Sequence, residues 1–322
     1  MHRRRLGRTG LEVSEIGYGA WGIGGVQWGG AEDDESIKGL NRAIDLGLNF
    51  IDTARAYGDG RSERLVGRVV RERSERVYVA TKVPPKNLKW PAPAGVDVAE
   101  VFPAAHVRRS VEASLESLGL DTVDLLQLHV WQDDWVGRGD WLEAVEDLRR
   151  EGKIRWFGIS INDHQPDNAL RAIEAGVADT VQVIFNVFDQ TPAERLLPAC
   201  AEHDVGVIVR VALDEGGLTG RIRADTEFAA DDFRRHYFGG GRAAEVERRV
   251  DAICADLGIA SDRMAETALR FVLSEPAVST VIPGMRSVRN VERNMAVGDG
   301  RGLPAEQVAK LRAHRWDRNF YE

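Results

Sequence analysis

LNFIDTARAYG, residues 48–58, joins a short apolar run to an aspartate and then to a tyrosine on the following loop. Asp52 comes directly after the apolar run, and Tyr57 lies a little further along the chain. Two other apolar runs end in the same way, at Lys82 in VYVATKV and at His129 in VDLLQLHV. In a parallel barrel the carboxyl ends of the strands converge on one mouth, where the chemistry of such folds is carried out. The sequence therefore predicts that an acid, a phenol, an amine and an imidazole meet at that mouth.

Apolar runs alternate with amphipathic segments along most of the chain. Eight runs have the character of strands, at residues 16–20, 48–51, 77–81, 123–128, 154–159, 180–184, 205–209 and 279–282. Helical patterns lie between them, and several end at a glycine, which accepts the left-handed conformation of a helix cap at little cost. Strict alternation of this kind predicts an α/β fold, a (β/α)8 TIM barrel. We expect residues 1–322 to form a single domain.

Three segments depart from the alternation. Residues 3–14, RRRLGRTGLEVS, predict an N-terminal β-hairpin placed to plug the bottom of the barrel. Residues 213–241 form a long, glycine-punctuated connection, and loops of that length in a compact domain usually have a function or are disordered. Beyond residue 303, PAEQVAKLRAHRW predicts an extra C-terminal helix.

Charge and composition exclude several classes of function. The 322 residues carry a net charge of −8, which argues against a nucleic-acid partner held by phosphate attraction. No apolar stretch approaches the roughly 20 residues of a membrane span, and no apolar region follows the basic start as a secretory signal would require. Cys200 and Cys254 offer neither a disulfide framework nor metal-ligand spacing. We therefore expect a cytoplasmic protein with no metal site and no membrane partner.

One glycine motif is misleading. Residues 17–22, GYGAWG, match G-x-G-x-x-G, and Asp52 follows a later strand as a ribose-binding acid would. The dinucleotide-binding fingerprint needs a helix that begins within the glycines and presents its amides to pyrophosphate. Here the first convincing helix starts only near Asp33, after a further glycine-rich stretch. These glycines are better explained by a flexible loop beside an active site.

The chemistry of the four polar residues points to proton donation. A tyrosine is a poor acid at neutral pH because its reference pKa is about 10, and a neighbouring lysine ammonium makes it a better donor. An aspartate paired with Lys82 would keep that lysine charged and in place. None of the four groups can reduce a carbonyl, so a nicotinamide is needed as the source of hydride.

The sequence resembles the aldo-keto reductase family over essentially the whole chain. The resemblance rests on GYGAW, FIDTARAYGDGRSERLVG, ATKV, DLLQLH, KIRWFGIS, VQVIFN, EGGLTG and VSTVIPGMRSVRNVERN. It implies reduction of an aldehyde or ketone to an alcohol, or the reverse, with hydride from the A face of NADPH and NADH less favoured. It makes Tyr57 the proton donor, Lys82 the group that lowers the pKa of Tyr57, Asp52 the partner of Lys82, and His129 the residue that orients the carbonyl.

The same resemblance implies the contacts of the cofactor. Residues 213–220 match the loop over the pyrophosphate, and residues 282–294 match the adenosine phosphate site, with Arg286 as the expected contact of a 2′-phosphate. The expected cofactor-binding residues are Gly19, Ala20, Trp21, Asp52, Ser160, Gln182, Arg210, Leu213, Gly217, Leu218, Gly284, Arg286, Asn290 and Asn294.

Three positions depart from the pattern of the family. Ser160 is followed by Ile161, so that Asn162 comes one place later than the usual asparagine that binds the carboxamide. Arg210 stands where many members stack an aromatic ring on the nicotinamide, and its charge could weaken the binding of cationic NADP⁺. Gly284 replaces a lysine of the 2′-phosphate site, for which Arg286, Arg289 and Arg293 offer substitutes.

The partner we expect is a small carbonyl or alcohol substrate, and nothing in the sequence specifies an oligomeric state. Four tryptophans on loops at the mouth are candidates for its pocket, namely Trp21, Trp28, Trp90 and Trp131. Two alternatives remain open. One is a cofactor-sensing subunit that resembles the β subunits of potassium channels, which share this fold and these four residues. The other is a barrel lyase that uses Lys82 as a Schiff base.

Overall fold

The computed structural model describes residues 1–25 and 27–321, and within them eight parallel strands form one sheet. In chain order the strands are β3 (Tyr18–Gly19), β4 (Phe50–Asp52), β5 (Tyr78–Val83), β6 (Val123–Leu128), β7 (Ile154–Ser160), β8 (Thr180–Ile184), β9 (Gly206–Arg210) and β10 (Val278–Val281). Each strand pairs with the next in sequence. Parallel bridges from Ile16 to Val281 and from Gly19 to Gly284 join the two ends of the sheet. The (β/α)8 barrel expected from the sequence is confirmed.

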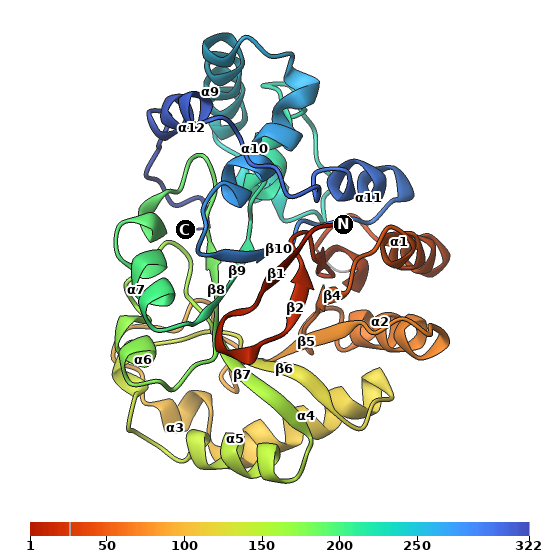
Figure 1. The fold of residues 1–322 in the computed structure, drawn as a ribbon, viewed down its shortest axis with the longest axis vertical. Coiled ribbons are helices and arrows are strands. Elements are labelled where there is room, and N and C mark those ends of the chain that lie inside the picture. The colour runs from red at the N-terminus through yellow and green to blue at the C-terminus, as the bar shows by residue number, and fades with distance from the viewer. Residues whose placement is uncertain (26, 322) are drawn as a thin grey trace.

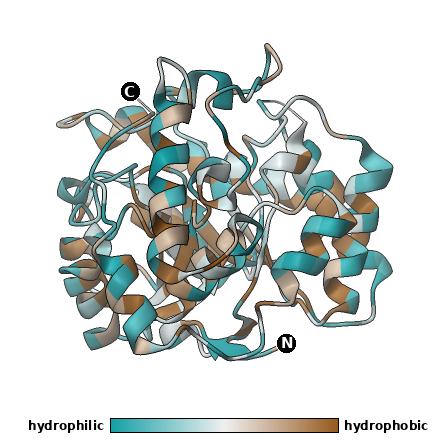
Figure 2. Cartoon of the chain, turned by 90° about the horizontal axis from the view of Figure 1, so that it is seen from above, coloured by the Kyte–Doolittle hydropathy of each residue, from teal (hydrophilic) through white to brown (hydrophobic). Residues whose placement is uncertain are grey.

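Helices connect the strands and surround the sheet (Figure 1). They are α1 (Asp33–Asp45), α2 (Arg61–Glu72), α3 (Val98–Val101), α4 (Ala104–Leu118), α5 (Trp141–Arg150), α6 (Leu170–Glu174), α7 (Leu196–Glu202), α8 (Arg234–Tyr237), α9 (Arg242–Leu257), α10 (Met264–Leu273), α11 (Val288–Met295) and α12 (Ala305–Arg312). Gly119 caps α4 in the left-handed conformation, with φ of 62°. Figure 2 shows hydrophobic residues gathered along the strands and along the helix sides that face them.

The strand boundaries agree with the sequence-based prediction to different degrees. β6 and β8 have the predicted limits, whereas the other strands differ at their ends. The first is the shortest, because only Tyr18–Gly19 pairs as a strand with β4. Gly19 is required there, since a Cβ would lie 2.4 Å from the carbonyl oxygen of Ile282 across the closure of the barrel. No α-helix begins within residues 17–22, as expected; a single 3-10 turn covers Gly22–Gly24, and α1 starts at Asp33.

An antiparallel hairpin closes one end of the barrel. It consists of β1 (Arg3–Arg5) and β2 (Glu12–Ser14), and in Figure 1 it crosses the centre of the ring of helices. Leu6 and Val13 are fully buried. They join a small apolar cluster that the barrel strands line from inside, with Phe50, Ala80, Leu125, Ile208 and Ile282. The predicted plug is confirmed.

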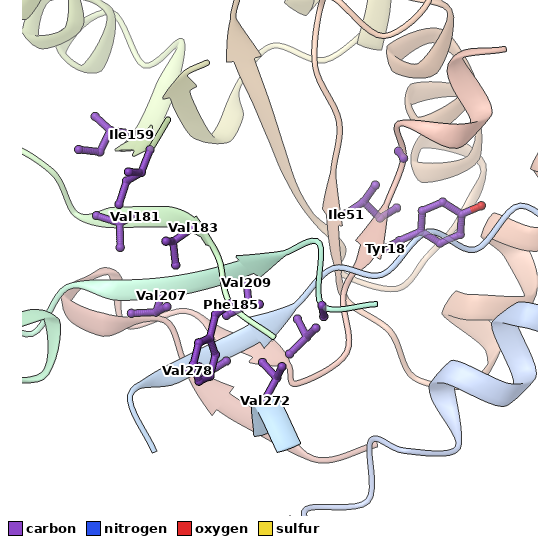
Figure 3. Close-up of a cluster of buried hydrophobic side chains, with 14 of the residues drawn as sticks. Tyr18, Ile51, Ile159, Val181, Val183, Phe185, Val207, Val209, Val272 and Val278 are labelled. Atoms are coloured by element: carbon purple, nitrogen blue, oxygen red, sulfur yellow. The ribbon is translucent and has the colours of Figure 1, made fainter. Parts of the chain in front are cut away.

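A larger core lies between the strands and the helices. Figure 3 shows side chains of β7, β8 and β9, among them Ile159, Val181 and Val207, gathered with Val278 of β10 and Val272 of α10. This packing fixes the strands and therefore the positions of the residues that follow their carboxyl ends. In the part of the chain that the structure describes, no helix is long and apolar enough to cross a membrane.

The long connection after β9 is only partly irregular. It contains a 3-10 segment, Asp214–Thr219, and the short helix α8. Its Phe233 ring lies 4.9 Å from the ring of Trp21 and 5.0 Å from that of Trp28, measured between centroids. The connection therefore reaches the mouth of the barrel, where a functional role was expected of it.

Candidate active site

The four residues singled out in the sequence lie together at the mouth. Asp52 is the last residue of β4, Lys82 lies near the end of β5, and His129 directly follows β6. Tyr57 lies on the loop between β4 and α2. The Tyr57 and His129 rings meet edge to face with centroids 5.7 Å apart. Parallel strands that end at the same edge of the barrel are what bring these side chains together.

Lys82 is the centre of the site. Its Nζ donates to Oδ2 of Asp52 at 2.5 Å, to the carbonyl oxygen of Thr53 at 2.9 Å and to Oη of Tyr57 at 3.3 Å. The side chains of Lys82 and Asp52 are buried. Burial acts to lower the pKa of Lys82, but Asp52 and Tyr57 outweigh it and raise that pKa. Lys82 therefore carries its positive charge beside the phenol at neutral pH.

Two glutamine amides hold the second oxygen of Asp52. Gln182 Nε2 donates to Oδ1 at 2.8 Å, and Gln127 Nε2 donates to the same atom at 3.0 Å. Gln182 Nε2 also donates to Oε1 of Gln127 at 3.2 Å, so the three side chains form a closed buried network. The sequence analysis missed Gln127. Its signal was a single amide within the apolar strand VDLLQL, which has to point into the barrel and find a polar partner there.

The acidity of Tyr57 is set by opposing effects. Burial raises the pKa of Tyr57, while Lys82 lowers it through its charge and its hydrogen bond, and the net pKa is raised. Arg210 also acts to lower it. Lys82 therefore lowers the pKa of Tyr57, as expected, but the effect of burial on that pKa is larger.

His129 is neutral at physiological pH. Burial lowers its pKa well below the ordinary value, and the charges of Lys82 and Arg210 add to that shift. Its Nδ1 is buried and has no hydrogen-bond partner among the described residues. A neutral ring of this kind can donate one hydrogen bond to an incoming oxygen without itself being the acid.

Aromatic side chains line part of the mouth. The Trp21 ring stacks on Tyr57 with centroids 6.2 Å apart and meets the edge of Trp28 at 5.2 Å. Trp90 is 45% exposed and lies 5.9 Å from the ring of His129. It also borders a cavity of about 420 Å³, together with Leu88 and residues of the loop after β4. These three tryptophans therefore lie near Tyr57 and His129, and their role in a substrate pocket stays a prediction.

Trp131 has a different position from the one expected. Its ring is fully buried and meets Trp135 and Trp141 edge to face, at 5.7 Å and 5.4 Å between centroids. The assignment of Trp131 to an open substrate pocket is therefore wrong. Hydrogen bonds of Asp133 tie the loop after β6 to residues 168–172, and Trp131 packs against Trp141, the first residue of α5.

Arg210, at the end of β9, is held by an ion pair. Its Nη2 donates to Oδ1 of Asp163 at 2.6 Å and to the carbonyl oxygen of Ile161 at 3.0 Å. Its Nε is buried and has no partner among the described residues. Asn162, beside this pair, accepts weakly from the backbone N–H groups of Ala92 and Trp131, at 3.4 Å and 3.3 Å. The amide of Asn162 therefore ties loops together, which agrees with its displaced position in the sequence.

The C-terminal segment reaches the same region. Tyr321 Oη donates to Oε1 of Glu215 at 2.5 Å, and Arg318 forms an ion pair with Asp214. Burial raises the pKa of Glu215 to about 7, and Asp214 acts in the same direction, while the hydrogen bond from Tyr321 opposes it. Both acidic residues adopt left-handed backbone conformations, with φ of 51° and 53°. The C-terminus thus fixes the 3-10 segment after β9.

A second cavity lies between that segment and α11. It has a volume of about 780 Å³, and Arg221, Arg289 and Arg293 line it together with Asp262 and Glu292. Burial lowers the pKa of Arg221, and the charges of Arg289 and Arg293 add to this. Three guanidinium groups around one cavity form a site suited to a phosphate group.

Arg286 does not line this cavity. Its Nη1 donates to the carbonyl oxygens of Trp28 and Gly30, at 2.6 Å and 2.8 Å. The expected contact of Arg286 with a 2′-phosphate stays a prediction, and the three arginines around the cavity are further candidates for it. Arg286 lies between β10 and α11 and ties this segment to the loop after β3, the strand that adjoins β10 at the closure of the barrel.

The other expected cofactor residues lie on or after β3, β7, β9 and β10 and on α11. They are Gly19 at the end of β3, Ala20 after it, Ser160 at the end of β7, Leu213, Gly217 and Leu218 on and beside the 3-10 segment, Gly284 in the closing bridge, and Asn290 and Asn294 on α11.

Sequence comparison places the chain among known reductases. The model of the aldo/keto reductase family matches residues 15–315. Aldo-keto reductase YhdN of Bacillus subtilis is 32% identical over 305 residues, which cover 91% of this chain and 87% of that protein. The NADH-specific methylglyoxal reductase of Escherichia coli is 30% identical, with coverage of 76% and 74%. A probable voltage-gated potassium channel subunit beta of Arabidopsis thaliana is 27% identical, with coverage of 93% and 92%.

Structural comparison agrees. The glycerol dehydrogenase AKR11B4 of Gluconobacter oxydans superposes with a TM-score of 0.77 and 29% identity, covering 97% of this chain and 94% of that one. The barrel, the motif residues gathered at its mouth and the match along nearly the whole chain lead to one conclusion. This chain belongs to the aldo/keto reductase family.

Proposed function

We propose that this protein is an NADPH-dependent oxidoreductase that reduces an aldehyde or ketone to an alcohol, or catalyses the reverse reaction. The observation that carries the proposal is the buried chain of contacts from Asp52 through Lys82 to Tyr57, with a neutral His129 beside the phenol. Such a chain is suited to giving one proton to a carbonyl oxygen. The family uses a nicotinamide, which supplies the hydride when it is bound.

Each of the four residues has a distinct task in this proposal. The carbonyl oxygen accepts a hydrogen bond from His129, and Tyr57 Oη donates the proton to that oxygen. Lys82 stabilises the phenolate that Tyr57 leaves behind, and Asp52 holds Lys82 in place. A positioned general acid contributes about 10²- to 10⁴-fold in rate. In the reverse direction Tyr57 accepts the proton of the alcohol.

The described residues fit a nicotinamide dinucleotide. At the mouth, the unpartnered Nε of Arg210 and Nδ1 of His129 are buried polar atoms that need an occupant. The residues carried over from the family, from Gly19 and Trp21 through Ser160 and Gln182 to the segment around Leu218, would hold the nicotinamide and pyrophosphate. Gln182 would then keep its Nε2 on Asp52 and offer its Oε1 to the carboxamide. The three-arginine cavity favours NADPH over NADH, because a 2′-phosphate would bring two negative charges to it.

The substrate pocket is proposed to lie among Trp21, Trp28, Trp90 and Phe233. Aromatic walls of this kind favour a substrate with a flat apolar or sugar-like face. The carbonyl end would reach Tyr57, which stacks against Trp21.

The test is NADPH oxidation by the purified protein over a panel of aromatic aldehydes, quinones and aldoses, with Tyr57→Phe alongside. We expect turnover of at least one class by the wild type and a loss of about 10²-fold or more in Tyr57→Phe. NADPH affinity should be nearly unchanged in the variant. Equal turnover by the two proteins would refute the role of Tyr57.

The two alternatives make different predictions. A regulatory subunit like the channel relative would bind NADPH and form a stable hetero-complex with negligible turnover over the panel. A Schiff-base lyase would leave a covalent adduct on Lys82 after borohydride trapping with a carbonyl substrate. The burial of Lys82 and its ion pair with Asp52 favour the protonated amine, which is not nucleophilic, and so support the reductase.

A further inference from the structure

An arginine stands beside the proton donor, and it is paired. Arg210 Nη2 lies 2.6 Å from Oδ1 of Asp163, and each of the two side chains is about one-fifth exposed. The pair is anchored on the barrel, since Arg210 ends β9 and its Nη2 also donates to the carbonyl oxygen of Ile161. Asp163 lies on the loop that follows β7. The end of β9 and the loop after β7, on either side of β8 in the sheet, therefore fix the guanidinium.

The guanidinium interacts electrostatically with the phenol and the imidazole. Its charge acts on both Tyr57 and His129, lowering the pKa of each. Three further groups surround it, because Glu215, Tyr321 and Asp163 all interact electrostatically with Arg210 or with one another. Of these, Asp163 makes the direct ion pair, while Glu215 is bound to Tyr321.

A cation at this position has a consequence for the cofactor. The reduced nicotinamide ring is neutral and the oxidised ring carries a positive charge. An unpaired guanidinium in a partly buried site would repel the oxidised ring and leave the reduced ring unaffected. A carboxylate 2.6 Å from the guanidinium cancels most of that field.

We propose that Asp163 is a positioning and charge-balancing residue that, through Arg210, sets the relative affinity of the site for NADP⁺ and NADPH. The inference rests on the proposed function, since it requires the nicotinamide to lie beside Arg210. Asp163 acts through Arg210 and does not touch the reacting atoms. The balance matters for turnover in both directions, because oxidised cofactor has to leave after reduction and bind before oxidation.

The test is a pair of fluorescence titrations of each variant, one with NADPH and one with NADP⁺, at fixed pH and ionic strength. Asp163→Asn should raise the Kd of NADP⁺ by roughly tenfold relative to the Kd of NADPH, because it leaves Arg210 unpaired. Arg210→Met should lower the Kd of NADP⁺ relative to the Kd of NADPH, because it leaves the negative charge of Asp163 unpaired. The double variant should return the ratio to within about threefold of the wild type.

A matched control is available on the same connecting segment. Asp167 pairs with Arg195 at 2.7 Å, with both side chains at least half exposed. Asp167→Asn removes an aspartate–arginine pair of similar length and should leave the ratio unchanged. If Asp163 had only a structural role, Asp163→Asn would weaken the binding of NADPH and of NADP⁺ equally.

The outcomes separate this inference from the proposed function. If wild-type protein binds both forms and Asp163→Asn leaves their ratio unchanged, the inference is overturned while the proposed function stands. If Arg210→Met shifts the ratio in the same direction as Asp163→Asn, charge balance is likewise refuted. If the wild type binds neither form, the proposed function itself fails.

Discussion

Lys82 shows how a single side chain organises this site. A buried ammonium is costly unless oxygen atoms surround it, and here a carboxylate, a carbonyl and a phenol do so. The same contacts aim its charge at Tyr57. The two amides of Gln127 and Gln182 then fix the carboxylate of Asp52 from the other side. The position of the Tyr57 hydroxyl therefore depends on buried residues that do not themselves contact it.

Glu215 gives a pH-dependent test at the same scale. Burial raises its pKa from 4.5 to about 7, so the folded protein holds a proton that the unfolded chain has lost. This difference in pKa stabilises the folded state fully below pH 4.5, and the stabilisation is lost as the pH rises from 4.5 to about 7. Above pH 7 the contribution of Glu215 no longer changes with pH. The free energy of unfolding of the wild type should therefore fall between pH 5 and 7.5. In Glu215→Gln this fall should be smaller by up to about 3 kcal/mol.

The measurement is urea unfolding of both proteins across that pH range. Glu202→Gln, at an exposed position of α7, is the control and should follow the wild type. Parallel pH dependences of wild type and Glu215→Gln would show that Glu215 does not titrate in this window.

Residue-level prediction from sequence succeeded where a local motif defines the residue. Asp52, Tyr57, Lys82 and His129 each end or follow an apolar run, and the barrel rule alone brings them together. Gln127 was missed because one amide in an apolar strand has no partner until the opposite strands are known. The burial of Trp131 and the path of Arg286 depend on which distant loops they meet, and no spacing along the chain contains that information.

At the scale of elements, the hairpin of β1 and β2 supports the barrel from the end opposite the mouth. Leu6 is fully buried in the inner cluster. Leu6→Ala should lower the free energy of unfolding by about 2–5 kcal/mol, through lost burial and the cavity left behind. The turnover number of the folded variant should stay at the wild-type value, because the plug does not contact the four polar residues.

Leu88→Ala provides the comparison for this prediction. Leu88 is 70% exposed, so the same chemical change should cost less than about 0.5 kcal/mol. Chemical denaturation of the three proteins decides the matter. A destabilisation by Leu6→Ala no larger than that by Leu88→Ala would mean that the hairpin adds little to the barrel.

Strands and helices were easier to predict from the sequence than the contacts of single residues. Apolar runs bounded by turn residues identify β6 and β8 to the residue, since their burial on both faces leaves few polar positions within them. The limits of β3 were less predictable, because its pairing depends on where two glycine-containing segments close the barrel. The short helix within residues 213–241 has no strong pattern and is held by contacts with the mouth.

At the scale of the whole molecule, the three-arginine cavity combines elements far apart in the chain. Arg221 belongs to the connection after β9, whereas Arg289 and Arg293 lie on α11. Replacing both arginines of α11 by alanine should raise the Kd of NADPH by about 10- to 100-fold. The Kd of NADH should change less than about threefold, because NADH lacks the 2′-phosphate.

Isothermal titration of the two cofactors measures this selectivity. Arg312→Ala, an exposed arginine on α12 outside the cavity, is the control. Equal weakening of NADPH binding and NADH binding would mean that the 2′-phosphate does not bind in this cavity. A wild type that binds NADH more tightly than NADPH would contradict the expected selectivity and resemble the NADH-specific relative.

In the proposed reaction, hydride passes from the nicotinamide to a carbonyl while Tyr57 supplies the proton. The most direct measurement uses NADPH deuterated on the A face of the nicotinamide, with an aldehyde that the wild type reduces. We expect deuterium on the carbinol carbon of the product with the wild type, and almost no labelled product with Tyr57→Phe while that variant still binds NADPH. Product without deuterium, or equal labelling by the two proteins, would contradict it.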